Sequence, residues 1–191
     1  MTVFVHPRGL CESSDVGAGT RVWAFAHVME GAAVGPGCNI GDHAFVESGA
    51  RLGANVTVKN GVFLWRGVTV EDDVFLGPGC VFTNDRRPRA WIKQAAGDEV
   101  ATTVRRGATI GANATVIAPT IVGPYAFVAA GAVVVRDVGA HELVAGAPSK
   151  RVGWVCECGE RLDEHLACGC GHRYRRIGKH AGLARRDEAH R

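Results

Sequence analysis

The feature that most constrains this chain is an aliphatic residue that returns every six positions. The first series begins at Val16, ends at Phe82 and passes through Val22, Val28, Val34, Ile40, Val46, Leu52, Val58, Leu64, Val70 and Leu76. A second series runs through Val104, Ile110, Val116, Val122, Val128 and Val134. Four positions after each of these residues, Phe82 excepted, stands a small residue or a valine. A two-site pattern of this length predicts a repeat architecture.

A period of six predicts an all-β chain that folds as a parallel β-helix. Each unit supplies one short strand and a bend, and three units close a triangular coil. The aliphatic and the small residue point inward, and stacked coils pair as parallel strands about 4.8 Å apart. Glycine often follows the aliphatic residue, as at Gly35 and Gly53, and we expect it to supply the backbone freedom that corners need. A β-sandwich would show alternation with a period of two, which is absent.

Composition agrees with a narrow interior. The 191 residues include 26 glycines and only 7% aromatic residues, and the apolar content is mostly Val and Ala. A net charge of +3 does not suggest a nucleic-acid-binding protein. We expect neither a membrane span nor a signal peptide, because no apolar run is long enough and the first ten residues lack the required blocks. A cytoplasmic protein with reduced or metal-bound cysteines is therefore expected.

The repeat also predicts the domain organisation. A β-helix domain should occupy residues 1–153, and the break between Phe82 and Val104 predicts a loop extruded at about residues 84–103. The first fifteen residues and the tail should cover the exposed end coils. Past Gly153 we expect a small cysteine-rich extension over residues 154–177, followed by a disordered polar tail over residues 178–191.

A central stretch carries a family resemblance. The sequence KNGVFLWRGVTVEDDVFLGPGCVFTNDRRPRA spans residues 59–90, and it is followed by RRGATIGANATV and VAGAPSKRVGWV. Together they resemble the nucleotide-sugar N-acetyltransferases of the hexapeptide-repeat class, over roughly residues 16–153. The resemblance implies a left-handed β-helix, a homotrimer, acetyl-CoA in a groove between coils, and active sites between subunits. It also implies acetylation of an amino group, at C3, on a UDP- or dTDP-linked deoxysugar.

The resemblance places the start of the extruded loop at the sugar. Asn84 would then hydrogen-bond the amine, and Asp85 would orient the sugar or accept a proton. His27 is the rival base, because it precedes the inward Val28 and should face outward; a histidine at a subunit interface is the other reading. No strong base is required in this family, since the departing CoA sulfur can accept the proton.

Ligand contacts follow from the same resemblance. Fixed backbone N–H groups suit the oxyanion, and coil turns lining the CoA groove would provide them at Gly111 and Ala112, or at Ala130 and Gly131. The closing turn GAPSKRVG would bring Lys150 and Arg151 to the phosphates of CoA.

The nucleotide sugar would be held by a second group of side chains. Arginine grips phosphate oxygens in pairs, which favours Arg89 and, more weakly, Arg86. Lys59 and Asn60 stand one coil away from the loop, where they would contact the base or the ribose.

Two Cys-x-Cys-Gly units in the extension predict a structural zinc site, with the ligands Cys156, Cys158, Cys168 and Cys170. One intervening residue is fewer than the two of usual knuckles, so His165 or His172 could replace a cysteine. Cys38 and Cys80 occupy the small inward position and are interpreted as core residues.

Three other functions share this fold. An O-acetyltransferase would need a histidine base, for which His27 is the candidate. A non-catalytic scaffold would need neither the loop nor the closing turn. A γ-class carbonic anhydrase needs histidines on adjacent coils, but the series from Val104 to Val138 contains none.

Overall fold

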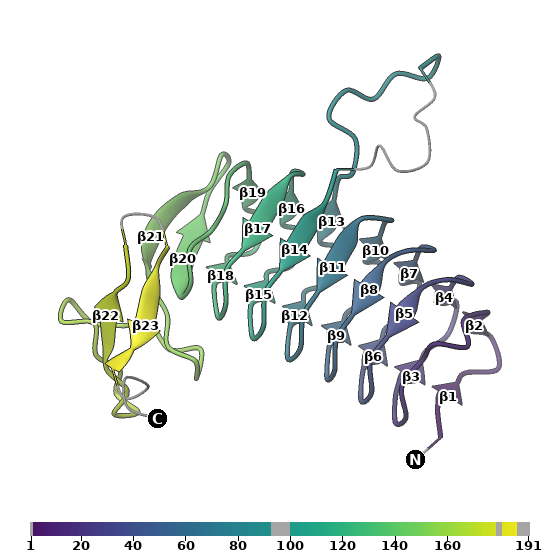
Figure 1. Cartoon of the computed structure of the whole chain (residues 1–191), viewed down its shortest axis with the longest axis horizontal. Coiled ribbons are helices and arrows are strands. Elements are labelled where there is room, and N and C mark those ends of the chain that lie inside the picture. The colour runs from purple at the N-terminus through teal and green to yellow at the C-terminus, as the bar shows by residue number, and fades with distance from the viewer. Residues whose placement is uncertain (1, 93–99, 179–180, 187–191) are drawn as a thin grey trace.

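The computed structural model describes residues 2–92, 100–178 and 181–186. These residues form a stack of short parallel strands, a left-handed parallel β-helix of about seven turns, as the six-residue period predicts (Figure 1). None of the described residues belongs to a helix that could cross a bilayer.

Three sheets form the sides of the stack. Sheet A contains, in spatial order, β1 (Phe4–Val5), β3 (Arg21–Val22), β6 (Asn39–Ile40), β9 (Thr57–Val58), β12 (Phe75–Leu76), β15 (Thr109–Ile110), β18 (Phe127–Val128), β20 (Glu142–Ala145) and β21 (Lys150–Trp154). Sheet B contains β19 (Val133–Val134), β16 (Thr115–Val116), β13 (Val81–Phe82), β10 (Phe63–Leu64), β7 (Phe45–Val46), β4 (His27–Val28) and β2 (Leu10–Cys11). Sheet C contains β17 (Thr120–Val122), β14 (Thr102–Val104), β11 (Val68–Val70), β8 (Arg51–Leu52) and β5 (Ala33–Val34).

The pairing register of the parallel strands stacks the aliphatic residues of successive coils into columns. Val22 pairs with Ile40 and Ile40 with Val58, and all three side chains are fully buried. The columns of the three sheets meet inside the prism, where valine and alanine fill a space too narrow for most aromatic residues. Cys38 and Cys80 lie in this core, as predicted. Burial raises the pKa of the Cys38 thiol, and it raises that of Cys80 to about 12.

The glycines that follow the aliphatic residues have a different role from the expected one. A Cβ on Gly35 would lie 2.4 Å from the carbonyl oxygen of Gly53 in the next coil, and one on Gly53 would lie 2.8 Å from the backbone nitrogen of Asp72. Neither glycine has a positive φ. These positions therefore need glycine because adjacent coils approach closely there, and the expectation that they relax the corners is wrong.

The corners turn two residues further along. The residue three positions after the aliphatic one has a left-handed backbone, as at Gly37 (φ 70°) and Gly131 (φ 69°). His43 and Asn55 adopt the same conformation, with φ values of 58° and 56°. Because non-glycine residues are tolerated there, this corner position is hard to recognise from composition.

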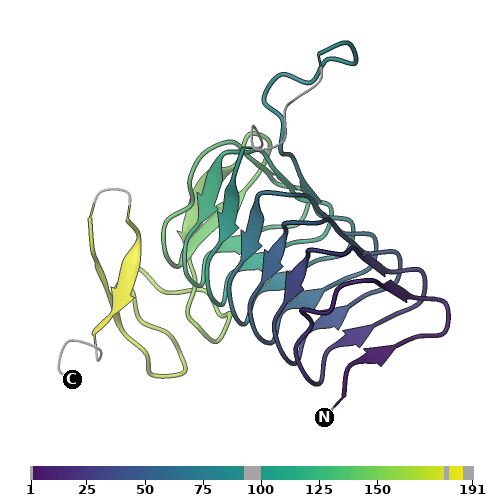
Figure 2. The same cartoon turned by 45° about the vertical axis from the view of Figure 1, so that its right-hand side comes forward.

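The loop leaves the stack between β13 and β14, as the broken repeat predicts, and stands away from it (Figure 2). It ends earlier than the expected residue 103, because Thr102 and Thr103 pair with Val68 and Thr69 in sheet C. Loop residues 93–99 lie outside the described residues. At the other end of the stack, β1 and β2 add an incomplete coil that covers β3 and β4.

The tail covers the last coil. The N–H of Leu183 donates to the carbonyl oxygen of Ala140 (3.0 Å), and Leu183 is buried. Leu183–Arg185 form β23, which pairs antiparallel with β22 (Tyr174–Arg176). The expectation of disorder from residue 178 onward therefore does not hold for this segment. Leu183 contributes an apolar group that the polar composition around it concealed.

The close approach of coils generates a stability prediction. Gly35→Ala should destabilise the fold by about 1–3 kcal/mol, because the new Cβ meets backbone that cannot move aside without disturbing the next coil. Thermal and denaturant unfolding would measure it. Val135→Ala, a truncation at the equivalent repeat position after β19, is the control; its side chain is exposed, so a change of at most about 0.5 kcal/mol is expected. Equal unfolding midpoints for Gly35→Ala and the native chain would contradict the packing argument.

Candidate active site

Most of the predicted ligand residues fall on one edge of the prism. The turns that lead from sheet A to sheet B form this edge, the A–B corner, at residues 23–26, 41–44, 59–62, 77–80, 111–114 and 129–132. It carries the predicted residues Lys59, Asn60, Gly111, Ala112, Ala130 and Gly131. Sequence-distant turns are thus brought into a line because successive coils stack in register, with the extra residues of one coil extruded as the loop.

Two of the four backbone N–H groups predicted to stabilise the oxyanion already take part in hydrogen bonds between coils. The N–H of Gly111 donates to Val128 O (2.8 Å), and the N–H of Gly131 donates to Ala112 O (2.9 Å). Within the described part of the chain, the N–H groups of Ala112 and Ala130 donate to no backbone carbonyl. Of the four predicted donors, these two, one coil apart, are therefore the ones that the coil ladder does not use.

The closing turn lies at the upper end of the same corner. Ser149 N–H donates to Val133 O (2.7 Å), which ties the turn after β20 to sheet B. Lys150 pairs with Ala145 and is exposed. Arg151 follows it, with its guanidinium carbon 4.8 Å from the centre of the Trp154 ring. Two basic side chains thus stand beside the last turns of the A–B corner.

The loop begins at a different edge, the B–C corner, where sheet B leads into sheet C. Trp65 Nε1 donates to Phe82 O (2.9 Å), and the N–H of Ala118 donates to Thr83 Oγ1 (3.0 Å). Val100 N–H donates to Asn84 O (3.1 Å), which closes the root of the loop. The backbone of the residue predicted to meet the amine is therefore fixed by the stack.

The predicted loop residues differ in exposure. Asn84 and Asp85 are half-buried, and Asp85 Oδ1 accepts a hydrogen bond from Arg87 N–H (2.7 Å). Arg86 and Arg89 are exposed, and Arg89 Nη1 donates to Pro88 O (2.9 Å). A polar root and exposed guanidinium groups further out suit a ligand with a neutral polar part and a phosphate part.

His27 faces outward from β4, as predicted, and is paired. Its Nε2 lies 2.9 Å from Glu12 Oε2, and its ring packs edge-on against Phe45. A carboxylate only accepts hydrogen bonds, so Nε2 carries the proton. The hydrogen bond from His27 lowers the pKa of Glu12 below its usual value. Pairing with a carboxylate is how enzymes orient a histidine base, and it also suits a structural pair.

One chain does not bring these groups together. Asn84 neighbours Ala118 through the Thr83 bond, whereas Ala112 lies at the other end of β16, roughly 15 Å away along an extended strand. His27 is three strands of sheet B from the loop root, roughly 14 Å. The predicted residues of one chain therefore form two separate groups, at the A–B corner and on the loop, which we call the half-sites.

Sequence reasoning missed three contributors to the site. The indole N–H of Trp65 supports the loop root, and nothing in the repeat pattern indicated that contact. Thr83 holds the other side of the loop root by accepting a hydrogen bond from Ala118. In the sequence, only its position next to Asn84 could have indicated this role. Glu12 carried no signal, because it lies in the first fifteen residues, before the repeat begins.

A hollow of about 400 Å³ lies on sheet C, away from both half-sites, beside Arg51, Thr69, Glu71, Asp72 and Arg106. Its acidic side chains already have partners. Glu71 accepts from Arg105 Nη1 (2.9 Å) and Arg106 N–H (2.9 Å), and Asp72 accepts from Ala54 N–H (2.7 Å). These contacts hold adjacent coils together.

Comparison with known proteins identifies the family. A family model described as the hexapeptide repeat of succinyl-transferase matches residues 31–66 and 103–136. A dTDP-3-amino-3,6-dideoxy-alpha-D-galactopyranose 3-N-acetyltransferase from Aneurinibacillus thermoaerophilus is 48% identical over 177 residues, which cover 91% of each chain. The chain belongs to the nucleotide-sugar N-acetyltransferases of the hexapeptide-repeat class. Members of this class are acyltransferases, so the chain is an enzyme.

Solved structures of acyltransferases have the same fold. The acetyltransferase domain of PglB from Neisseria gonorrhoeae matches with a TM-score of 0.53 and 24% identity, over 78% of this chain and 57% of that one. The UDP-N-acetylglucosamine acyltransferase of Francisella novicida matches with a TM-score of 0.53 and 14% identity, over 80% of this chain and 69% of that one. At these identities the comparison establishes a common architecture.

The paired histidine generates a testable prediction. In His27→Ala, the pKa of Glu12 should rise toward its usual value, because the hydrogen bond that favours the carboxylate is lost. NMR titration of ¹³C-labelled glutamate carboxyls in the full chain would measure the shift. His165→Ala is the control, since His165 lies beside Glu164 in the extension and should leave Glu12 unchanged. An identical Glu12 pKa with and without His27 would show that the pair does not form in solution.

Proposed function

We propose that this enzyme transfers the acetyl group of acetyl-CoA to the 3-amino group of a dTDP-linked 3-amino-3,6-dideoxyhexose. The observation that carries the proposal is the 48% identity, over 91% of each chain, to an enzyme named for that reaction. An alignment that covers 91% of this chain spans the loop root and the closing turn, where the two half-sites lie. Both cosubstrates are made in the cytoplasm, so we propose that the enzyme works there.

The A–B corner would hold the acetyl donor. Among the described residues, no backbone carbonyl accepts from the N–H groups of Ala112 and Ala130, and these two groups would stabilise the oxyanion. Lys150 and Arg151 would meet the phosphates of CoA, beside the coil turns that receive its pantetheine arm. Gly111 and Gly131 would permit the close approach of that arm, although their own N–H groups belong to the coil ladder.

The loop would hold the nucleotide sugar. Asn84 and Asp85 would contact the sugar from the fixed root, and Arg86 and Arg89 would pair with the diphosphate. Lys59 and Asn60, exposed on the A–B corner, would contact the base or ribose. This assignment places the positively charged arginines at the negatively charged diphosphate and the polar residues of the loop root at the sugar.

The transfer itself needs little from acid–base side chains. The neutral amine attacks the thioester carbonyl carbon, and the N–C bond forms as the carbonyl oxygen takes the negative charge. Collapse of this intermediate breaks the C–S bond, and the CoA sulfur receives the proton that the nitrogen loses. The enzyme's contribution is to place the two reactants and stabilise the oxyanion.

Because the half-sites of one chain are separated, we propose a homotrimer in which the loop of one copy meets the A–B corner of its neighbour. The outer face of sheet B supports this, since Phe45, Phe63 and Trp65 pack against one another there. Phe63 is 45% exposed and Val81 49% exposed in the isolated chain. Exposed aromatic columns of this kind mark protein interfaces.

The test of function is release of CoA thiol. Purified enzyme and acetyl-CoA would be mixed with dTDP- and UDP-linked sugars that carry an amine at C3 or C4. Rapid release with a dTDP-3-amino sugar is expected. The His27–Glu12 pair is the one observation that favours an O-acetyltransferase. Binding of CoA with no turnover of any amino sugar, but turnover of a hydroxyl acceptor, would overturn the proposed function in favour of that activity.

Asn84 generates a kinetic prediction. Asn84→Ala should lower kcat/KM for the amino sugar by about 10²-fold or more while leaving the unfolding temperature within a few degrees, because its backbone contact to Val100 survives. Asn39→Ala, on the outer face of sheet A, is the matched control and should retain native turnover. Native kinetics in Asn84→Ala would remove this residue from the site.

The sheet B face generates a prediction about assembly. Phe63→Glu should convert the trimer to smaller species, because a carboxylate would be buried among aromatic rings without a partner. Light scattering coupled to size-exclusion chromatography would report the mass. Thr57→Glu, at the outward position of β9 in sheet A, is the control and should remain trimeric. If the unsubstituted protein is itself a monomer in this measurement, the proposed homotrimer is wrong.

A further inference from the structure

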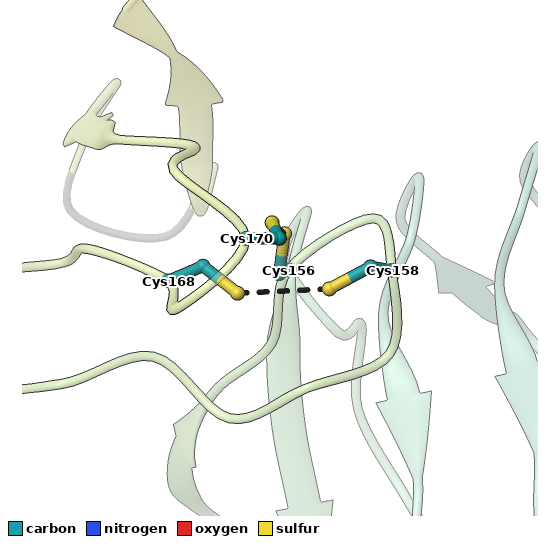
Figure 3. A group of neighbouring side chains, drawn as sticks. All are labelled: Cys156, Cys158, Cys168 and Cys170. Atoms are coloured by element: carbon teal, nitrogen blue, oxygen red, sulfur yellow. Dashed lines mark hydrogen bonds between the residues drawn. The ribbon is translucent and has the colours of Figure 1, made fainter.

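The C-terminal extension brings four thiols to one point. The sulfur atoms of Cys156, Cys158, Cys168 and Cys170 all lie within 4.8 Å of one another (Figure 3). Two of the pairs are closer, at 3.5 Å for Cys156 and Cys170 and 3.6 Å for Cys158 and Cys168. The two cysteines of each Cys-x-Cys unit face the two of the other unit.

The two units are built alike. Cys156 N–H donates to Glu160 O (2.8 Å) and Gly159 N–H donates to Cys156 O (2.9 Å). Cys168 N–H donates to His172 O (2.9 Å) and Gly171 N–H donates to Cys168 O (2.9 Å), at the same spacing. Both glycines have positive φ values, 91° and 96°. Two identical tight turns thus present their sulfurs to each other.

The arrangement matches the size of a tetrahedral metal site. Four thiolates at about 2.3 Å from a Zn²⁺ ion are about 3.8 Å from one another, which lies within the observed range of separations. Histidine is not needed as a ligand: His165 lies beside Glu164, and His172 Nδ1 is 3.4 Å from the sulfur of Cys156 but outside the four-sulfur group. The short Cys-x-Cys spacing is therefore compatible with four converging sulfurs.

The cluster is connected to the end of the β-helix through aromatic rings. The fully buried Tyr174 places its hydroxyl 3.2 Å from the sulfur of Cys156, and its ring centre is 4.7 Å from that of His141. His141 stacks in turn on Tyr125 of the last coils. Among the described residues of the extension, the buried side chains besides the cysteines are few: Val155, Leu162, Tyr174 and Leu183. So few apolar groups rarely hold a segment of this size without a cross-link.

We propose that Cys156, Cys158, Cys168 and Cys170 bind one structural Zn²⁺ ion that holds the C-terminal extension against the last coil of the β-helix. The ion takes no part in acetyl transfer. It fixes the chain that follows β21, the strand that carries Lys150 and Arg151.

The test measures metal in the full chain, purified under reducing conditions without chelator. Elemental analysis should find one zinc per chain. Cys158→Ser, which changes an exposed ligand, should retain the β-helix and hold less than about a tenth of that zinc. Cys11→Ser is the matched control, because Cys11 lies in β2 far from the cluster in sequence and should keep one zinc per chain.

Two further measurements make the proposal falsifiable if Cys158→Ser proves unstable. Cobalt added to the zinc-free native chain should give the absorption of a tetrahedral tetrathiolate site. A strong chelator should lower the unfolding temperature of the native chain and of Cys11→Ser. The proposal is overturned if the reduced chain binds neither zinc nor cobalt, if iron is the bound metal, or if the purified chain is lighter by four hydrogen atoms, which indicates two disulfides.

Discussion

The hydrogen-bonded ladder between successive coils is the constraint on which the rest of the structure depends. Every coil must return to the same register, so Val22, Ile40 and Val58 stack directly above one another. The ladder leaves little space at certain corners, which is why Gly35 cannot carry a Cβ. Each coil is held by its neighbours alone, so both ends need covers, and the chain provides them with β1 and β2 at one end and with its extension at the other.

The same regularity determines what the site can be. Identical coils place equivalent turns in a line, and this produces a continuous A–B corner with the N–H groups of Ala112 and Ala130 one coil apart. An insertion can leave the stack only at a corner, and here it leaves at the B–C corner, where Trp65 and Thr83 fix its root. A rigid prism cannot bend these two edges together, so a catalytic centre that uses both has to be completed by a second copy.

The sequence predicted the fold well because a period of six has few structural solutions. It also predicted an insertion after Phe82 and a group of four cysteines in the extension. It was less informative where tertiary contacts decide the outcome. The N–H of Gly111 is used by Val128, a residue one coil away, and Glu12 reaches His27 across a part of the chain without a repeat. Leu183 is a single apolar residue in a polar tail, so its burial in β23 left no periodic signal.

The proposed sharing of one catalytic centre by two copies can be tested with a crystal structure that contains both CoA and a dTDP-linked 3-amino sugar. We expect the sugar amine to lie near the sulfur of CoA, with Asn84 of one copy on the sugar. Ala112, Ala130 and Lys150 of a neighbouring copy should then line the CoA groove. Both ligands bound by residues of a single copy would rule out a shared centre.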